Sequence, residues 1–208
     1  VIINFLGIKF IASRMGQKKA LLFGTYGAIG TSVLMFCLMV WGDPSSFSFT
    51  NISFFTIAFC LLWIFQKGFS GISGNIVIPM TADCADYETY RTGKYVPGLM
   101  GTLFSFVDKV ISSLASTIVA LMFALVGYAQ EVPTDKSPWS EGLFWVVVIA
   151  FTIVPIIGWL CNVVAMKFYP LTKEKMEEIQ EKIAEIKAKN LAENEAAAAA
   201  EAVEAELP

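Results

Sequence analysis

The stretch Met80-Thr-Ala-Asp-Cys-Ala-Asp-Tyr87 ends one long apolar segment, and Leu103-Phe-Ser-Phe-Val-Asp-Lys109 lies well inside the next. The first stretch brings two aspartates to the end of a hydrophobic span, and the second carries an Asp-Lys pair into the middle of one. A charged side chain near the centre of a bilayer costs roughly 2.5 to 3.5 kcal/mol on insertion scales, so it usually faces a partner or a wet cavity. The sequence therefore predicts a polar path through a membrane.

The composition also places the chain in a membrane. Of its 208 residues 56% are apolar, and the mean hydropathy is +0.62, whereas soluble domains are about 45 to 50% apolar. Residues 1–170 hold 10 Lys and Arg against 8 Asp and Glu, while residues 171–208 hold 5 against 10. The membrane part is thus mildly basic and the tail acidic.

Several classes of function find no support in the residue types. The basic residues form no stripe, so we expect no nucleic-acid partner. The 4 cysteines stand singly and the chain has 0 histidines, which argues against a zinc site, a disulfide framework and a histidine general base. We expect no enzymatic activity, no metal site and no cofactor in this chain.

Hydropathy predicts one transmembrane bundle over residues 1–168. A helix needs about 20 residues to cross the hydrocarbon core. Four segments meet this length, and they follow a partial helix at 1–13: about 20–41, 52–82, 98–128 and 142–167. Because the chain opens abruptly with Val1 in apolar sequence, we expect it to be the C-terminal piece of a larger membrane protein.

The loop charges predict the orientation of the bundle. Basic residues lie before the second segment, between the third and fourth, and after the last, whereas the other two loops carry only Lys136. By the positive-inside rule, the basic loops and the C-terminus are cytoplasmic.

The segment after the last span has a different pattern. Residues 169–190 place Leu171, Ile179 and Ile183 on one face among Glu and Lys, which predicts an amphipathic cytoplasmic helix. This helix could lie on the membrane or pack on cytoplasmic loops. Residues 191–208 form an Ala/Glu-rich tail of low complexity.

Four motifs resemble one family of carriers. Arg14-Met-Gly-Gln-Lys-Lys19 resembles the basic loop that the major facilitator superfamily repeats in each half of its twelve-helix fold. Asp83-Cys-Ala-Asp-Tyr87, the Leu103–Lys109 stretch and Tyr169-Pro-Leu-Thr-Lys-Glu-Lys-Met-Glu-Glu-Ile179 are similar to the glycoside-pentoside-hexuronide:cation symporters, the melibiose-carrier family. The resemblance implies an all-α membrane protein of the major facilitator type, represented here from the end of helix 8 through helix 12.

The same resemblance implies a function. Family members move a sugar or glycoside inward with Na+, H+ or Li+ by alternating access, in the plasma (bacterial inner) membrane. The acidic residues that hold the coupling Na+ or H+ lie mainly in the N-terminal half of the family, so the missing N-terminal helices are the expected partner of this chain. Gly74 stands where the melibiose carrier has Trp, so that carrier's sugar specificity does not carry over.

Five residues are candidates for the solute and cation cavity. Lys109 matches a family lysine beside the central site, and we expect it to face the cavity. Lys67 and Asp108 fall at matching depth on consecutive helices, which suggests an interhelical ion pair, because two unpaired charges there would each be costly. Gln66 and Asn75 offer amides that could bind sugar hydroxyls. The alternatives are that Lys109 only pairs inside the bundle and that Lys67 lines water by itself.

A second candidate site is a cytoplasmic gate. Its acidic side consists of Asp83, Asp86 and Tyr87 at the end of a helix. Its basic side consists of Arg14, Lys18, Lys19 and Arg91. We expect salt bridges between the two sides to form when the carrier opens outward and to break when it opens inward. Otherwise the carboxylates are simply exposed at the interface.

Two other functions stay open at this point. A related carrier could move a non-sugar solute such as a lysolipid, and an apolar cavity that opens sideways to lipid would favour it. A noncatalytic membrane subunit could bind a partner through the acidic tail, and polar residues that face protein would favour that.

Overall fold

The computed structural model describes residues 14–93, 97–129, 133–134 and 137–185, and within them it contains helices and loops but no strand. The helices are α2 (Gln17–Trp41), η1 (Pro44–Ser46), α3 (Phe54–Thr92), α4 (Pro97–Leu125), α5 (Glu141–Val148), η2 (Ile149–Ile153) and α6 (Val154–Phe168). A further helix covers residues 173–185 and is named here the C-terminal helix. The predicted partial helix at 1–13 and the tail at 191–208 lie outside the described residues.

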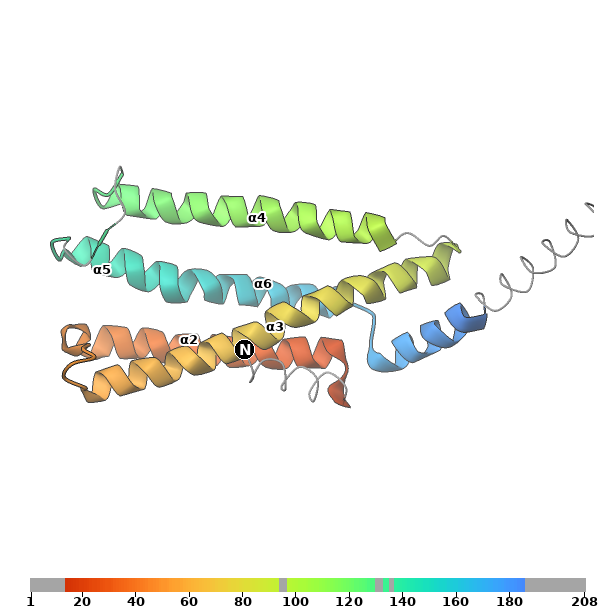
Figure 1. The fold of residues 1–208 in the computed structure, drawn as a ribbon, viewed down its shortest axis with the longest axis horizontal. Helices are drawn as coiled ribbons and strands as arrows, with labels where there is room; N and C mark the ends of the chain where they lie inside the picture. Colours follow the sequence, from red (N-terminus) through yellow and green to blue (C-terminus); the bar gives the residue numbers. More distant parts are fainter. Residues whose placement is uncertain (1–13, 94–96, 130–132, 135–136, 186–208) are drawn as a thin grey trace, which may run out of the picture.

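Four helical segments are long and apolar enough to cross a membrane: α2, α3, α4, and the continuous run of α5, η2 and α6. Helix α2 packs against α3, η2 and α6, and α4 contacts α3 and α5 (Figure 1). Many large apolar side chains of these helices are exposed and few are buried, as expected where lipid covers them. The predicted class, an all-α membrane protein, is confirmed.

Helix α3 is longer than its hydrophobic part. Ser53 caps its start by accepting a hydrogen bond from the Thr56 amide, and Gly93 ends it with φ +70°, donating its own amide to the Thr89 carbonyl. The apolar span predicted at about 52–82 ends before the helix does, because the polar residues 83–92 continue the helix up to its C-cap at Gly93. Its 39 residues extend about 58 Å, well beyond a hydrocarbon core of about 30 Å.

The last span contains one turn of π-helix. This turn, η2, lies directly before Pro155, which has no amide hydrogen to donate to the preceding turn. Thr152 is buried there and donates its hydroxyl to the Val148 carbonyl at 2.6 Å. The span therefore stays one continuous helix with a local widening.

Small residues bring α2 and α3 into close contact. Ala20, Gly24, Ala28 and Ser32 follow one another at intervals of four along α2, and all four are buried. A Cβ atom on Gly24 would lie 2.9 Å from the Phe69 carbonyl oxygen and the Ser73 amide nitrogen, so the two backbones touch. These residues hold the α2–α3 pair that carries most of the polar groups described below.

Candidate functional site

A buried polar junction joins three membrane-spanning helices. Thr25 of α2 is completely buried, and its hydroxyl lies 3.0 Å from the Ser73 hydroxyl of α3. Asn162 of α6 donates its side-chain amide to the same Thr25 oxygen at 3.0 Å. Sequence reasoning did not identify these three residues. Their residue types are only a weak indication of a polar junction, since single Ser, Thr and Asn residues in apolar spans also occur where no such contact forms.

Gln66, a predicted cavity residue, belongs to the same interface. It is 5% exposed, and its amide nitrogen donates to the Ser32 hydroxyl of α2 at 2.9 Å. Gln66 therefore fastens α3 to α2 and does not face an open surface in this structure. Asn75, the other predicted amide, is exposed on α3.

The predicted ion pair between Lys67 and Asp108 is not formed in the described part of the chain. The Lys67 ammonium lies over the ring of Trp63, one turn earlier on α3, at 4.5 Å from the ring centroid. Trp63 in turn stacks on Phe151 of η2, with centroids 4.7 Å apart and an interplanar angle of 5°. The pairing prediction rested on depth alone. Helices α3 and α4 diverge from their connection at the end of α3 (Figure 1), so equal depth does not bring the two charges together.

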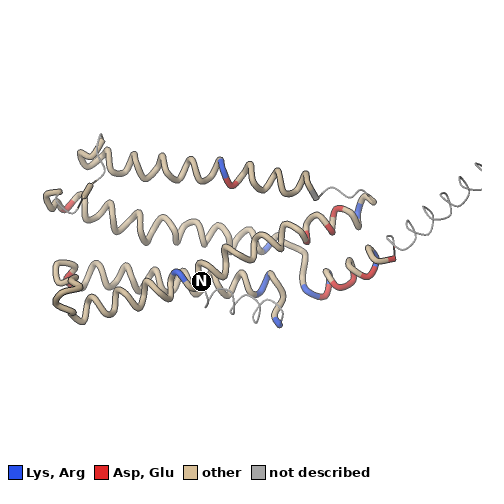
Figure 2. Tube along the Cα trace, viewed as in Figure 1, with Lys and Arg blue, Asp and Glu red and all other residues tan. Residues whose placement is uncertain are grey.

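The Asp108–Lys109 pair lies in the middle of α4, away from either end of the helix (Figure 2). Both residues are exposed, and within residues 97–125 no described side chain is buried. Within the described ranges, neither charge has an ion-pair partner. Because α4 is apolar enough to cross a membrane, these two charges need a polar neighbour or water there.

A second group of charges gathers at one end of the bundle (Figure 2), which we call the charged end. It consists of residues 14–19, the last turns of α3 at 83–92, and residues 167–185. The C-terminal helix packs on α3 there through Ile179 and Ile183, together with Leu171 just before the helix, and all three are at most 5% exposed. Their partners on α3 are Cys84, Tyr87 and Tyr90. The sequence left open whether this helix lies on the membrane or packs on protein, and in the structure it packs on protein.

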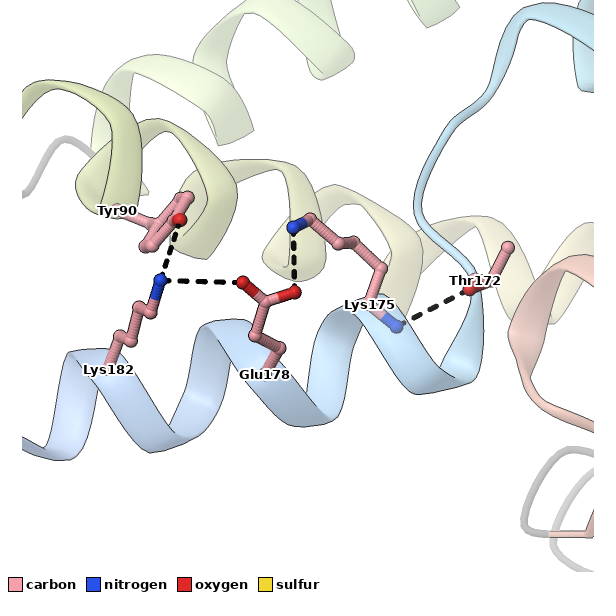
Figure 3. A network of polar contacts seen from close by, with 5 residues as sticks. All are labelled: Tyr90, Thr172, Lys175, Glu178 and Lys182. Atoms are coloured by element: carbon pink, nitrogen blue, oxygen red, sulfur yellow. Dashed lines mark hydrogen bonds and ion pairs between the residues drawn. The ribbon is translucent and has the colours of Figure 1, made fainter.

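Polar contacts extend the same interface (Figure 3). Lys182 donates to the Tyr90 hydroxyl at 3.2 Å and to Glu178 at 3.4 Å, and Lys175 pairs with Glu178 at 2.8 Å. The Lys175 backbone amide donates to the Thr172 hydroxyl and so fixes the start of the helix. The three charged side chains are well exposed, so the apolar contacts carry most of the stabilisation and these polar contacts orient the helix.

The residues of the predicted gate lie at the charged end, but their hydrogen bonds and ion pairs differ from the expected salt bridges. Asp86 accepts a hydrogen bond from Gln180 of the C-terminal helix at 2.6 Å, and Arg91 pairs with Glu88 at 3.1 Å on its own helix. Lys18 donates to the Tyr169 carbonyl.

The remaining gate residues lie nearby. Tyr87 packs on the C-terminal helix, Lys19 lies near Glu174, and Arg14 is exposed. Asp83 lines a hollow of about 300 Å³ together with Gln17, Met176 and Gln180.

The expected direct bridges from Asp83 and Asp86 to Lys18, Lys19 or Arg91 are therefore not among the ion pairs of the described residues. Lys18 and Asp86 are instead engaged by residues 169–185, since Lys18 donates to the Tyr169 carbonyl and Gln180 donates to Asp86, while Arg91 pairs with Glu88 on α3. Whether such bridges form in another conformation stays a prediction. Within the described residues, no three His, Cys, Asp or Glu side chains cluster closely enough to hold a metal ion.

These observations define a bundle of helices long and apolar enough to cross a membrane, with charges within α3 and α4 and a charged end on which the C-terminal helix packs. The model of the family described as MFS/sugar transport protein matches residues 1–173, and the chain belongs to this family. The predicted family resemblance is thereby confirmed at the level of major facilitator sugar transport proteins.

Several curated proteins are similar to the chain. A "Glucuronide carrier protein homolog" of Escherichia coli is 28% identical over 81% of this chain and 33% of its own length. An "Isoprimeverose transporter" of Lactiplantibacillus pentosus is 25% identical over 88% of this chain and 34% of its own length. A "Putative sulfoquinovose importer" of Salmonella typhimurium is 24% identical over 64% of this chain and 25% of its own length. The chain thus spans about a third of the length of the first two relatives and a quarter of the third, and no solved structure matches it.

Proposed function

We propose that the protein containing this chain is a secondary active transporter that moves a sugar or glycoside by alternating access. The family match over residues 1–173 carries the proposal, because it covers all four candidate membrane spans found among the described residues. The names of the relatives support a sugar or sugar derivative as the solute.

We further propose that the transport is symport coupled to Na+ or H+. The coupling ion would be held mainly by helices outside this chain, with Lys109 and Asp108 lining the cavity from α4. Two charges at mid-span without a partner in the described chain support this placement, since such charges mark an ion or solute path more often than a structural contact. In this proposal the bundle lies in the plasma membrane with its C-terminus in the cytoplasm.

The test is uptake by vesicles that carry the full-length protein. The panel of labelled solutes includes a glucuronide and isoprimeverose, each measured with and without an imposed Na+ or H+ gradient. We expect gradient-dependent accumulation of at least one of them. If no solute accumulates although the protein is folded and inserted, the proposal is wrong, and a lysolipid carrier or an accessory membrane subunit takes its place.

Variants of Lys109 test its place in the cavity. Lys109→Ala should abolish gradient-driven uptake while the amount of protein in the membrane stays the same. Lys167→Ala serves as the matched control, because it removes an exposed lysine at the end of α6 and should leave uptake near normal. Near-normal uptake by Lys109→Ala would remove Lys109 from the path.

A further inference from the structure

A hollow of about 260 Å³ lies between α2 and α6 near the charged end. Its lining consists of four largely apolar side chains and two lysines: Leu22, Tyr26, Val163, Met166, Lys18 and Lys167. The three that belong to α2 follow one another at intervals of four and so share one face of that helix. Because α2 and α6 pack against each other, the hollow is a groove between two membrane-spanning helices. We call it the α2–α6 groove.

The two lysines lie at the same end of the α2–α6 groove. Lys18 is in the first turn of α2, and Lys167 is in the last turn of α6. Lys18 donates to the carbonyl of Tyr169, the residue that directly follows α6, so its ammonium is held beside the end of that helix. Tyr26 lies eight residues further along α2, about 12 Å deeper in the bundle. The groove thus has two cations at its rim and apolar walls below them.

A second hollow continues the positive charge outward from the rim. It measures about 210 Å³ and shares Lys18 with the α2–α6 groove. Its other charged lining residues are Lys19, Lys173 and Glu174, so the side chains around it carry three positive charges and one negative charge. The region just outside the groove is therefore basic as well, which favours a ligand with an anionic group at this level.

We propose that the α2–α6 groove binds one anionic phospholipid, with its phosphate between Lys18 and Lys167 and an acyl chain along the apolar walls. Charge and shape together favour this occupant. Basic pockets between membrane-spanning helices on the cytoplasmic side bind anionic headgroups, and the charged end lies on that side in the proposed orientation. A free phosphate would gain nothing from the apolar walls, whereas each buried methylene group of a lipid chain adds to its affinity. The inference goes beyond the proposed function, since it concerns a lipid and not the solute.

The experiment compares phosphatidylglycerol with phosphatidylcholine that has the same acyl chains. Binding of each to the full-length protein in detergent is measured by native mass spectrometry, which counts the bound lipids. Either lysine alone would still attract a phosphate, so the test variant replaces both, as Lys18→Gln/Lys167→Gln. Each lysine near an anionic headgroup contributes about fivefold, so this variant should bind phosphatidylglycerol roughly 25-fold more weakly than wild type.

Two further variants separate the rim from the walls. Lys175→Gln/Lys182→Gln removes the same charge from the charged end outside both hollows, and it should bind phosphatidylglycerol as wild type does. Val163→Trp fills the apolar part of the groove and keeps both lysines, and it should also weaken lipid binding. An equal loss in the two double variants would mean that only the overall charge attracts the lipid, and it would overturn the inference.

The remaining outcomes concern the occupant. Equal wild-type affinity for the two lipids would overturn the inference, as would inorganic phosphate that displaces phosphatidylglycerol from both wild type and Val163→Trp, because the occupant would then be a free anion. If Lys18→Gln/Lys167→Gln does not fold, phosphatidylglycerol with a photoactivatable acyl chain decides on the wild type. Cross-links to the walls of the α2–α6 groove support the site, and cross-links only elsewhere overturn it. Solute uptake is measured separately, so failure of this inference leaves the proposed function standing.

Discussion

At the scale of single residues, Gly24 is the glycine of α2 where an added Cβ atom would come closest to the backbone of α3. A methyl group there would lie 2.9 Å from two backbone atoms of α3, which cannot move without shifting the whole helix. We expect Gly24→Ala to destabilise the protein by about 1 to 3 kcal/mol, the usual cost of overpacking a tight interface. Thermal unfolding followed by size-exclusion chromatography in detergent measures this effect.

The control lies on the same helix. A Cβ atom on Gly30 would meet nothing within 4 Å, so Gly30→Ala removes a flexible residue without a clash. It should leave stability unchanged or raise it by up to about 1 kcal/mol through helix propensity. Equal melting temperatures for the two variants would show that α2 and α3 do not approach as closely as described.

For single residues, the sequence predicted the position of each charge along its helix better than it predicted the side chain that the charge contacts. Lys67, Asp108 and Lys109 do lie within membrane-spanning helices, because charge and hydropathy alone determine that. Depth along a helix also follows from counting residues. The partner of a side chain depends on which helix lies beside it and on the direction of each helix face, and neither is determined by depth. The Lys67–Asp108 pairing therefore could not be derived.

Among the helices, the C-terminal helix gives the clearest test of packing. Ile179 is completely buried in its contact with α3, while Glu181, two residues later, is exposed. Ile179→Ala should weaken the docking of this helix by roughly 2 to 5 kcal/mol, as for other buried aliphatic truncations. Hydrogen exchange of the amides at 173–185 should become faster, and Glu181→Ala should leave it nearly unchanged. Unchanged exchange in Ile179→Ala would show that the helix is held by something other than this apolar contact.

The same helix should respond to acid through Glu178. Its hydrogen bond from Lys175, the Lys175 charge and the contact with Lys182 together lower the pKa of Glu178 below its ordinary value of 4.5. A lowered pKa means that the carboxylate stabilises the helix above about pH 4.5 and that this contribution is lost as the pH falls through the folded-state value.

Hydrogen exchange at several pH values measures this contribution against Glu178→Gln, after correction for the intrinsic pH dependence of exchange. Wild type should be better protected than the variant at pH 7, and the difference should shrink as the pH is lowered below 4.5. A difference that stays constant down to the lowest pH at which the protein remains folded would show that Glu178 acts through packing and not through its charge.

The lengths of the helices follow from local signals to different degrees. Hydropathy predicted four full spans, and the described residues contain four helical segments long and apolar enough to cross a membrane, because a run of apolar residues favours a membrane helix. Helix α3 continues ten residues beyond the apolar span predicted at about 52–82, since hydropathy detects the membrane boundary and not the helix end. The helix ends at Gly93, which has a positive φ. The hydropathy falls earlier, at Asp83, and so does not indicate where the helix ends.

In the whole molecule, helix lengths and charges together predict how the chain crosses the membrane. Helix α2, with 25 residues, extends about 37 Å and spans the hydrocarbon core once. The turn containing η1 must then lie on the opposite side from the charged end. Because Lys and Arg are concentrated at the charged end, the positive-inside rule predicts that this end faces the cytoplasm.

This topology can be measured by labelling single cysteines in a variant of the full-length protein whose native cysteines, including the four of this chain, are replaced. Ser45→Cys lies in the exposed turn of η1, and Glu181→Cys lies on the exposed face of the C-terminal helix. In intact cells a membrane-impermeant maleimide should label Ser45→Cys but not Glu181→Cys, and in inside-out vesicles the pattern should reverse. The predicted topology has an odd number of membrane crossings between the two positions. Labelling of both positions from one side would contradict it. Labelling with the sides exchanged would leave the crossings intact but overturn the orientation, and with it any gate at the cytoplasmic end.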